Sequence, residues 1–111
     1  MKAVIAALIL MAPPLCAEDV RLDGPAITLA LADRALIYDD GATQVFRAGG
    51  ETIYDSGSPS TGRWGVREDR YCSVWPPSDH WACYDLTRKA DGRTLTFVAD
   101  DSSTTSGHYA P

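Results

Sequence analysis

The sequence contains no cluster of lysine and arginine residues, and this absence excludes one large class of proteins. Its 111 residues include 10 Lys and Arg against 15 Asp and Glu, which gives a formal net charge of −5. Proteins that bind nucleic acid neutralise phosphates with a basic surface, because the phosphate backbone dominates their affinity. The acidic balance of this chain therefore predicts that it does not bind nucleic acid.

Long hydrophobic runs are also missing. The longest run, residues 3–12, is about half of the roughly 20 residues that a helix needs to cross a bilayer, so no membrane span is expected. The run follows the positive charge of Lys2, and Pro13-Pro14 and the small residue Ala17 come after it. These features are typical of a signal peptide, which we predict over residues 1–17. A buried N-terminal helix is the alternative interpretation.

The predicted signal peptide also predicts where the rest of the chain is located. Cleavage after Ala17 leaves residues 18–111 as one small domain, which we expect to be periplasmic or secreted. A lipid anchor on Cys16 is not expected, because lipidation requires small residues before the cysteine and Pro14 and Leu15 stand there.

Cysteine and histidine are scarce. Of the three cysteines, Cys16 lies in the predicted signal peptide, so the mature chain keeps Cys72 and Cys83. An even pair in an exported chain predicts one disulfide bond. The two cysteines are too far apart in sequence for a zinc knuckle, and the two histidines, His80 and His108, lack the paired spacing of metal ligands. We therefore expect no metal site and no cofactor.

The first element expected in the mature chain is a short helix. Asp23 can cap its first turn, and Pro25 is tolerated at a helix start. Apolar residues follow at helical spacing between Ile27 and Leu31, which predicts an amphipathic helix over residues 25–33. The same apolar residues also alternate as in a strand, so a strand is the alternative.

Beyond residue 34 the pattern is β throughout. Short runs that alternate between apolar and polar residues are separated by turn residues, with a loop at 56–62 and a break or bulge at Glu68-Asp69. Such spacing predicts a mainly β fold, an antiparallel meander of about 6–8 short strands that curls into a small barrel or sandwich, with one short N-terminal helix. The expected strands are residues 35–38, 43–48, 51–55, 63–66, 70–75, 81–88, 94–99 and 104–109.

The cysteines lie on two of these strands, and the hairpin that joins them has a definite register. A four-residue loop at 76–79 places Cys72 opposite Cys83, Tyr71 opposite Tyr84, and Val74 opposite Trp81. A cross-strand disulfide there is expected to stabilise the fold by about 2–3 kcal/mol through the short loop that it closes.

Aromatic residues make up only 9% of the chain, but they are concentrated. Tryptophan and tyrosine are amphipathic and favour recognition surfaces. We therefore predict that the hairpin and its neighbours bind a partner protein or a small ligand of the cell envelope. The candidate binding residues are Trp64, Tyr71, Trp75, Trp81 and Tyr84, with Arg63 and His80 beside them. The alternative is that most of these rings belong to the core.

A catalytic site is not expected, and we predict that the protein is not an enzyme. Ser78-Asp79-His80 contains the residue types of a hydrolase triad, but no Gly-x-Ser-x-Gly motif is present, and adjacent loop residues rarely align nucleophile, base and orienting group. Turn formation after Pro76-Pro77 explains the same residues. A small hydrolase that uses His80 remains an alternative function.

Three segments resemble one group of proteins. Residues 62–66 (GRWGV), 71–78 (YCSVWPPS) and 81–84 (WACY) are similar to a pattern of small exported proteins of alphaproteobacteria, whose role is uncharacterised. This resemblance implies the small β fold and the exported location. It implies no activity.

A second resemblance concerns the end of the chain. Residues 106–110 (SGHYA) resemble the Ser-Gly-x-x-Tyr loop of periplasmic lysozyme inhibitors, with the spacing one residue shorter. The resemblance implies an alternative function, inhibition of an enzyme by a loop inserted into its cleft. A structural accessory domain of the envelope is a further alternative, and the sequence does not indicate an oligomeric state.

Overall fold

The computed structural model describes residues 18–111 of the chain. The predicted signal peptide, residues 1–17, lies outside the described residues. Within the described part, nine strands and one helix follow one another, and no helix there is long and apolar enough to span a membrane.

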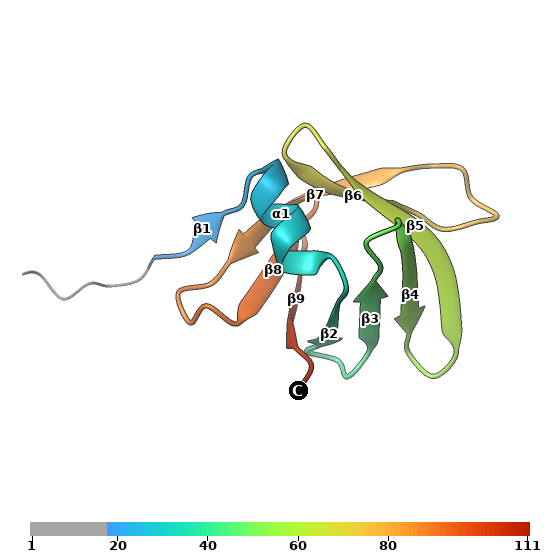
Figure 1. Cartoon of the computed structure of the whole chain (residues 1–111), viewed down its shortest axis with the longest axis horizontal. Helices are drawn as coiled ribbons and strands as arrows, with labels where there is room; N and C mark the ends of the chain where they lie inside the picture. Colours follow the sequence, from blue (N-terminus) through green and yellow to red (C-terminus); the bar gives the residue numbers. More distant parts are fainter. Residues whose placement is uncertain (1–17) are drawn as a thin grey trace, which may run out of the picture.

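Eight of the strands form a closed antiparallel barrel. Each strand from β2 to β9 pairs with the next one along the chain, and β9 pairs back with β2 (Figure 1). The strands are β2 (Arg34–Tyr38), β3 (Thr43–Phe46), β4 (Glu51–Asp55), β5 (Pro59–Arg67), β6 (Arg70–Val74), β7 (Ala82–Arg88), β8 (Thr94–Val98) and β9 (Thr104–Tyr109). The predicted mainly β meander with one short helix is confirmed, and of the two predicted architectures it adopts the barrel.

The ninth strand, β1 (Val20–Arg21), was not predicted from the sequence. It pairs with Thr87 and Arg88 at the end of β7. This part of the β7 edge is free, because β6 pairs only with residues 82–84. A segment of two residues has no periodicity to detect, so this strand depends on the tertiary contact with β7.

Helix α1 (Gly24–Leu31) closes one end of the barrel. The helix begins after Asp23, whose carboxylate accepts a hydrogen bond from the Ala26 N–H at 3.0 Å, as the predicted cap requires. Ile27 and Leu31 are fully buried among the apolar residues of the barrel interior. The helix ends at Leu31, before the predicted limit, because Asp33 adopts a left-handed conformation (φ 57°) that leads into β2.

The direction of the strands gives the barrel two different ends. Strands β2, β4, β6 and β8 begin at the helix end, and the strands between them finish there, because neighbours are antiparallel. Burial of apolar surface at the helix end stabilises the fold. The inward side chains at this closed end are Leu36, Phe46, Trp64, Leu86 and Leu95, each at most 7% exposed.

Two hairpins differ from the sequence predictions. The loop expected at 56–62 is only a turn, because β5 begins at Pro59, which pairs with Asp55 of β4. The expected break at Glu68-Asp69 is a two-residue turn with both residues at positive φ (53° and 57°), a geometry that matches the twist of paired strands. The Asp69 carboxylate also accepts the Gly24 N–H at 2.7 Å, which ties this turn to the start of α1.

The hairpin of β6 and β7 has the predicted register but a longer loop. Tyr71 pairs with Tyr84 and Cys72 with Cys83, as expected, but pairing ends at Ser73 and Ala82. The prediction that Val74 lies opposite Trp81 is therefore wrong, and residues 75–81 form the connection. Pro76 and Pro77 lie within this connection and have no N–H to donate to a ladder.

The predicted disulfide between Cys72 and Cys83 is present. It joins two Cα atoms 4.0 Å apart on the outer face of the β6–β7 hairpin. Beside it, the Arg70 guanidinium pairs with the carboxylates of Asp85 (3.0 Å) and Asp100 (2.8 Å). These ion pairs are solvated and contribute little, so the covalent bond is the main stabilising feature of this face.

Removal of this bond is expected to cost stability. The variant Cys72→Ala/Cys83→Ala should lose about 2–3 kcal/mol of unfolding free energy, because the unfolded chain is no longer restricted by the closed loop. Urea denaturation of the variant and of the oxidised protein measures the difference, and the reduced wild type is the control. Equal midpoints for all three would contradict the assignment of stability to the disulfide.

Candidate functional site

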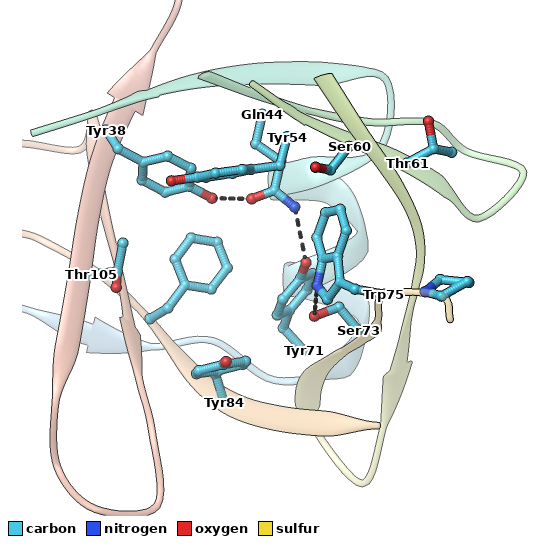
Figure 2. Close-up of a pocket in the computed structure, with 12 residues that line it drawn as sticks. Tyr38, Gln44, Tyr54, Ser60, Thr61, Tyr71, Ser73, Trp75, Tyr84 and Thr105 are labelled. Atoms are coloured by element: carbon cyan, nitrogen blue, oxygen red, sulfur yellow. Dashed lines mark hydrogen bonds between the residues drawn. The ribbon is translucent and has the colours of Figure 1, made fainter. Parts of the chain in front are cut away.

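The end of the barrel opposite α1 opens into a cavity of about 560 Å³. We call this cavity the mouth. It is formed where β2, β4, β6 and β8 finish and where β3, β5, β7 and β9 begin, so residues from distant parts of the sequence meet there (Figure 2). The residues that line it are Tyr38, Gln44, Tyr54, Ser60, Thr61, Tyr71, Ser73, Trp75, Pro76, Tyr84, Phe97 and Thr105.

Aromatic rings form the walls of the mouth. The rings of Tyr54 and Trp75 meet edge to face with centroids 6.3 Å apart, and those of Tyr84 and Phe97 do the same at 6.4 Å. Phe97 also contacts Tyr71 at 5.0 Å. Such contacts hold the rings in fixed orientations, which gives the mouth a defined shape before any ligand enters.

A polar cluster of Tyr38, Gln44, Thr52 and Tyr71 lies at the inner side of the mouth. The Gln44 side-chain oxygen accepts a hydrogen bond from the Tyr38 hydroxyl, and its nitrogen donates to Thr52 Oγ1 at 2.8 Å and to the Tyr71 hydroxyl at 3.2 Å (Figure 2 shows the tyrosine contacts). All four residues are at most 6% exposed. Buried polar groups are costly unless they are bonded, and here the network gives both the oxygen and the nitrogen of the Gln44 amide a partner.

The position of Trp75 is fixed by a glycine. A Cβ atom built at Gly62 of β5 would lie 2.6 Å from the Trp75 ring, so only glycine leaves room for the indole to lie against this strand. The Trp75 Nε1–H donates to Ser73 Oγ at 3.3 Å, which orients the ring further. Gly62 of β5 and Ser73 of β6 therefore hold Trp75 at the entrance.

Several hydroxyls of the mouth are free to bind a ligand. Within residues 18–111, the hydroxyls of Tyr54 and Tyr84 have no hydrogen-bond partner, and both side chains are half-buried. Ser60, Thr61 and Thr105 are exposed and form the rim of the mouth. A hydroxyl both donates and accepts, so these groups can adapt to either kind of ligand atom.

No charged side chain of the described residues lines the mouth. The two buried tyrosines also remain neutral: burial raises the pKa of Tyr71 to about 12, although hydrogen bonds with Ser73 and Gln44 lower it in part. Burial, followed by the neighbouring tyrosines, raises the pKa of Tyr38 still further above its usual value. The mouth is therefore a polar but uncharged site near neutral pH.

The structure brings three of the predicted binding residues together in the mouth and separates the others. Tyr71, Trp75 and Tyr84 line the cavity. Trp64 is buried at the closed end, where its Nε1–H donates to the Arg47 carbonyl at 2.8 Å.

The remaining predicted residues lie outside the mouth. Trp81 is 40% exposed in the β6–β7 connection, beside the exposed His80. The Arg63 guanidinium donates to the Gly49 carbonyl at 3.3 Å on the outside of the barrel.

Nine of the twelve residues that line the mouth were missed from the sequence, and four of these nine belong to its walls and polar cluster: Tyr38, Gln44, Tyr54 and Phe97. They lie on β2, β3, β4 and β8, and only closure of the barrel places them opposite the β6–β7 hairpin. The sequence offered one signal for them: each lies two residues from another inward residue on its strand, as Tyr38 does from Leu36. That signal identifies an inward face without showing that part of it is hollow.

The residues considered for catalysis and metal binding are not part of the mouth. Ser78 Oγ accepts the backbone N–H of His80 at 3.1 Å, which is a turn interaction. His108 is exposed on β9, and residues 106–109 form part of that strand rather than a projecting loop. Among residues 18–111, no group of three His, Cys, Asp or Glu side chains is arranged to hold a metal ion.

Comparisons of the chain with models of protein families, with curated proteins and with solved structures found no match.

The raised pKa of Tyr71 predicts how stability depends on pH. An unfolded tyrosine ionises near pH 10, whereas folded Tyr71 keeps its proton to about pH 12, so the unfolding free energy should fall as pH rises through this window. Urea denaturation at about pH 8 and about pH 11 measures the fall. Between these two pH values, the unfolding free energy of the Tyr71→Phe variant should fall by about 1 kcal/mol less than that of the wild type. Equal losses would contradict the assignment to Tyr71.

Proposed function

We propose that this protein is an exported, non-catalytic binding protein that holds a small ligand in the mouth of its barrel. The observation that carries the proposal is the cavity itself, about 560 Å³ in volume, with aromatic walls and unpartnered hydroxyls. Ligand sites commonly have 300–1,000 Å³, mostly apolar walls and a few fixed polar groups. An eight-stranded barrel is wide enough for side chains to fill it or for one small ligand to enter.

The chemistry of the lining supports binding over catalysis. The residues that line the mouth include no histidine, cysteine, lysine or carboxylate, which are the common acids, bases and nucleophiles of enzymes. The raised pKa of Tyr71, about 12, keeps its hydroxyl protonated near neutral pH, so it supplies hydrogen bonds rather than a base.

Two observations support export. Residues 1–17 have the charge, apolar run and small residue of a signal peptide. Cys72 and Cys83 form a disulfide, and disulfides persist mainly in oxidising compartments outside the cytosol. A periplasmic or secreted location accounts for both.

The export proposal predicts the state of the mature chain. When the full sequence is produced in a Gram-negative host, the protein should be recovered from the periplasm, should begin at Glu18 and should react with no thiol reagent. Cell fractionation measures the first property, and mass spectrometry of the intact protein, before and after treatment with the reagent, measures the other two. A chain that retains Met1, a lipid mass on Cys16, or two reactive thiols would contradict the proposal.

The binding proposal predicts different effects for two tryptophans. The probe is N-phenyl-1-naphthylamine, an uncharged aromatic dye that fluoresces when it leaves water. Trp75→Ala should weaken its binding by roughly tenfold or more, because Trp75 is a wall of the mouth. Trp81→Ala is the matched control and should bind as the wild type does, since Trp81 lies outside the mouth and is 40% exposed.

Circular dichroism must show that both variants are folded. Folded variants with equal affinity, or a folded wild type that does not bind the dye, would place the binding site elsewhere.

A further inference from the structure

We propose that the mouth selects uncharged aromatic ligands and discriminates against ligands of the same shape that carry a negative charge. This inference rests on the proposed function and adds the chemical class of the ligand. It is carried by the lining of the mouth, where aromatic rings and hydroxyls occur without a charged side chain.

The aromatic walls favour a flat, ring-containing ligand. Tyr54 and Trp75 stand edge to face on one side, and Tyr84 and Phe97 do so on the other. Aromatic rings gain from edge-to-face and offset contacts beyond the area that they bury. A planar ring inserted between the two pairs meets aromatic surface on both sides, and a flexible aliphatic chain lacks this complementarity.

Hydroxyl groups determine which polar atoms the ligand can carry. Tyr54 and Tyr84 have hydroxyls without a partner among residues 18–111, and both residues line the mouth. Each of these groups can donate to a carbonyl or accept from a phenol or an amine. One or two neutral polar substituents on the ring are therefore satisfied in the mouth.

An anionic ligand receives no such compensation. Arg70, on the outer face of the hairpin, is bound to Asp85 and Asp100, and the charges of the open end outside the lining, Asp40 and Asp55 among them, are carboxylates that cannot compensate an anion. Tyr38 and Tyr71 stay neutral in the folded protein, so they supply no counter-charge. A charge that leaves water without a partner pays a desolvation penalty, which lowers affinity for the charged form of an otherwise suitable ligand.

Two dyes with a common ring skeleton test the inference. N-phenyl-1-naphthylamine is uncharged, and 8-anilino-1-naphthalenesulfonate differs by one sulfonate group. Each is titrated into the mature protein, and occupancy of the mouth is measured as energy transfer from Trp75, with Trp75→Phe as the blank. The uncharged dye should bind at least roughly tenfold more tightly than the anionic dye.

A positive charge introduced at the rim should reduce the discrimination against the anion. Ser60 is exposed and lines the mouth, so Ser60→Lys places an ammonium group beside a bound ligand without disturbing the core. The ratio of the two affinities should then move roughly threefold to tenfold in favour of the anionic dye. Ser58→Lys, in the exposed turn before β5 and outside the mouth, adds the same net charge and should leave both affinities unchanged.

The outcomes separate this inference from the function on which it rests. If neither dye produces energy transfer from Trp75, the mouth is not a ligand site and both proposals fail. If both dyes bind there with similar affinity, or Ser60→Lys and Ser58→Lys have the same effect, the mouth binds ligands but the selection against negative charge is refuted.

Discussion

Strands β2 and β9 pair through residues 36–38 and 107–109, and this pairing turns a sheet with two free edges into a barrel. The pairing requires a glycine, because a Cβ atom at Gly107 would lie 2.9 Å from the Tyr38 ring. Closure removes the exposed edges that make open sheets prone to aggregate. It also brings Tyr38 and Phe97 to the same cavity as Trp75, so the mouth exists only because the sheet is closed.

The two ends of the barrel differ in composition, and we assign them different roles: the closed end is packed with apolar side chains, and the open end holds the proposed ligand site. At the closed end, α1 places Ile27 and Leu31 against an apolar interior that includes Phe46 and Trp64. At the open end the interior is polar and partly hollow, and it is held in shape by the Gln44 hydrogen bonds and by ring contacts. Rigid support beneath an open site is the arrangement that keeps ligand-binding side chains in place.

Local features of the sequence predicted much of the fold. Asp23 and Pro25 indicate the helix start, turn residues separate the strands, and the spacing of Cys72 and Cys83 predicts both the hairpin register and the disulfide. These signals succeed because each depends on neighbours along one or two adjacent strands. The two-residue strand β1 and the early separation of β6 from β7 depend on distant contacts, and they could not be inferred in this way.

The candidate site was predictable only in part, for the same reason. The cluster of tryptophan and tyrosine between residues 64 and 84 correctly drew attention to Tyr71, Trp75 and Tyr84, which line the mouth. The cluster could not separate them from the buried Trp64 or the exposed Trp81, because inward and outward positions at the two ends of a barrel look alike in sequence. The role of Gln44 could not be predicted, because it depends on hydrogen bonds with three partners on other strands.

The places where the described chain enters and leaves the barrel have a practical consequence. Asp19 is bound to Lys89 and Ala90 just beyond the end of β7, and Ala110 donates its N–H to the Ala35 carbonyl near the start of β2. Both positions are at the closed end. A tether attached to either end of residues 18–111, whether to a surface, a carrier or a second protein, therefore leaves the barrel on the side away from the mouth. Anchored in this way, the molecule presents its open end to the surrounding solution, and the path of a ligand into the cavity stays clear.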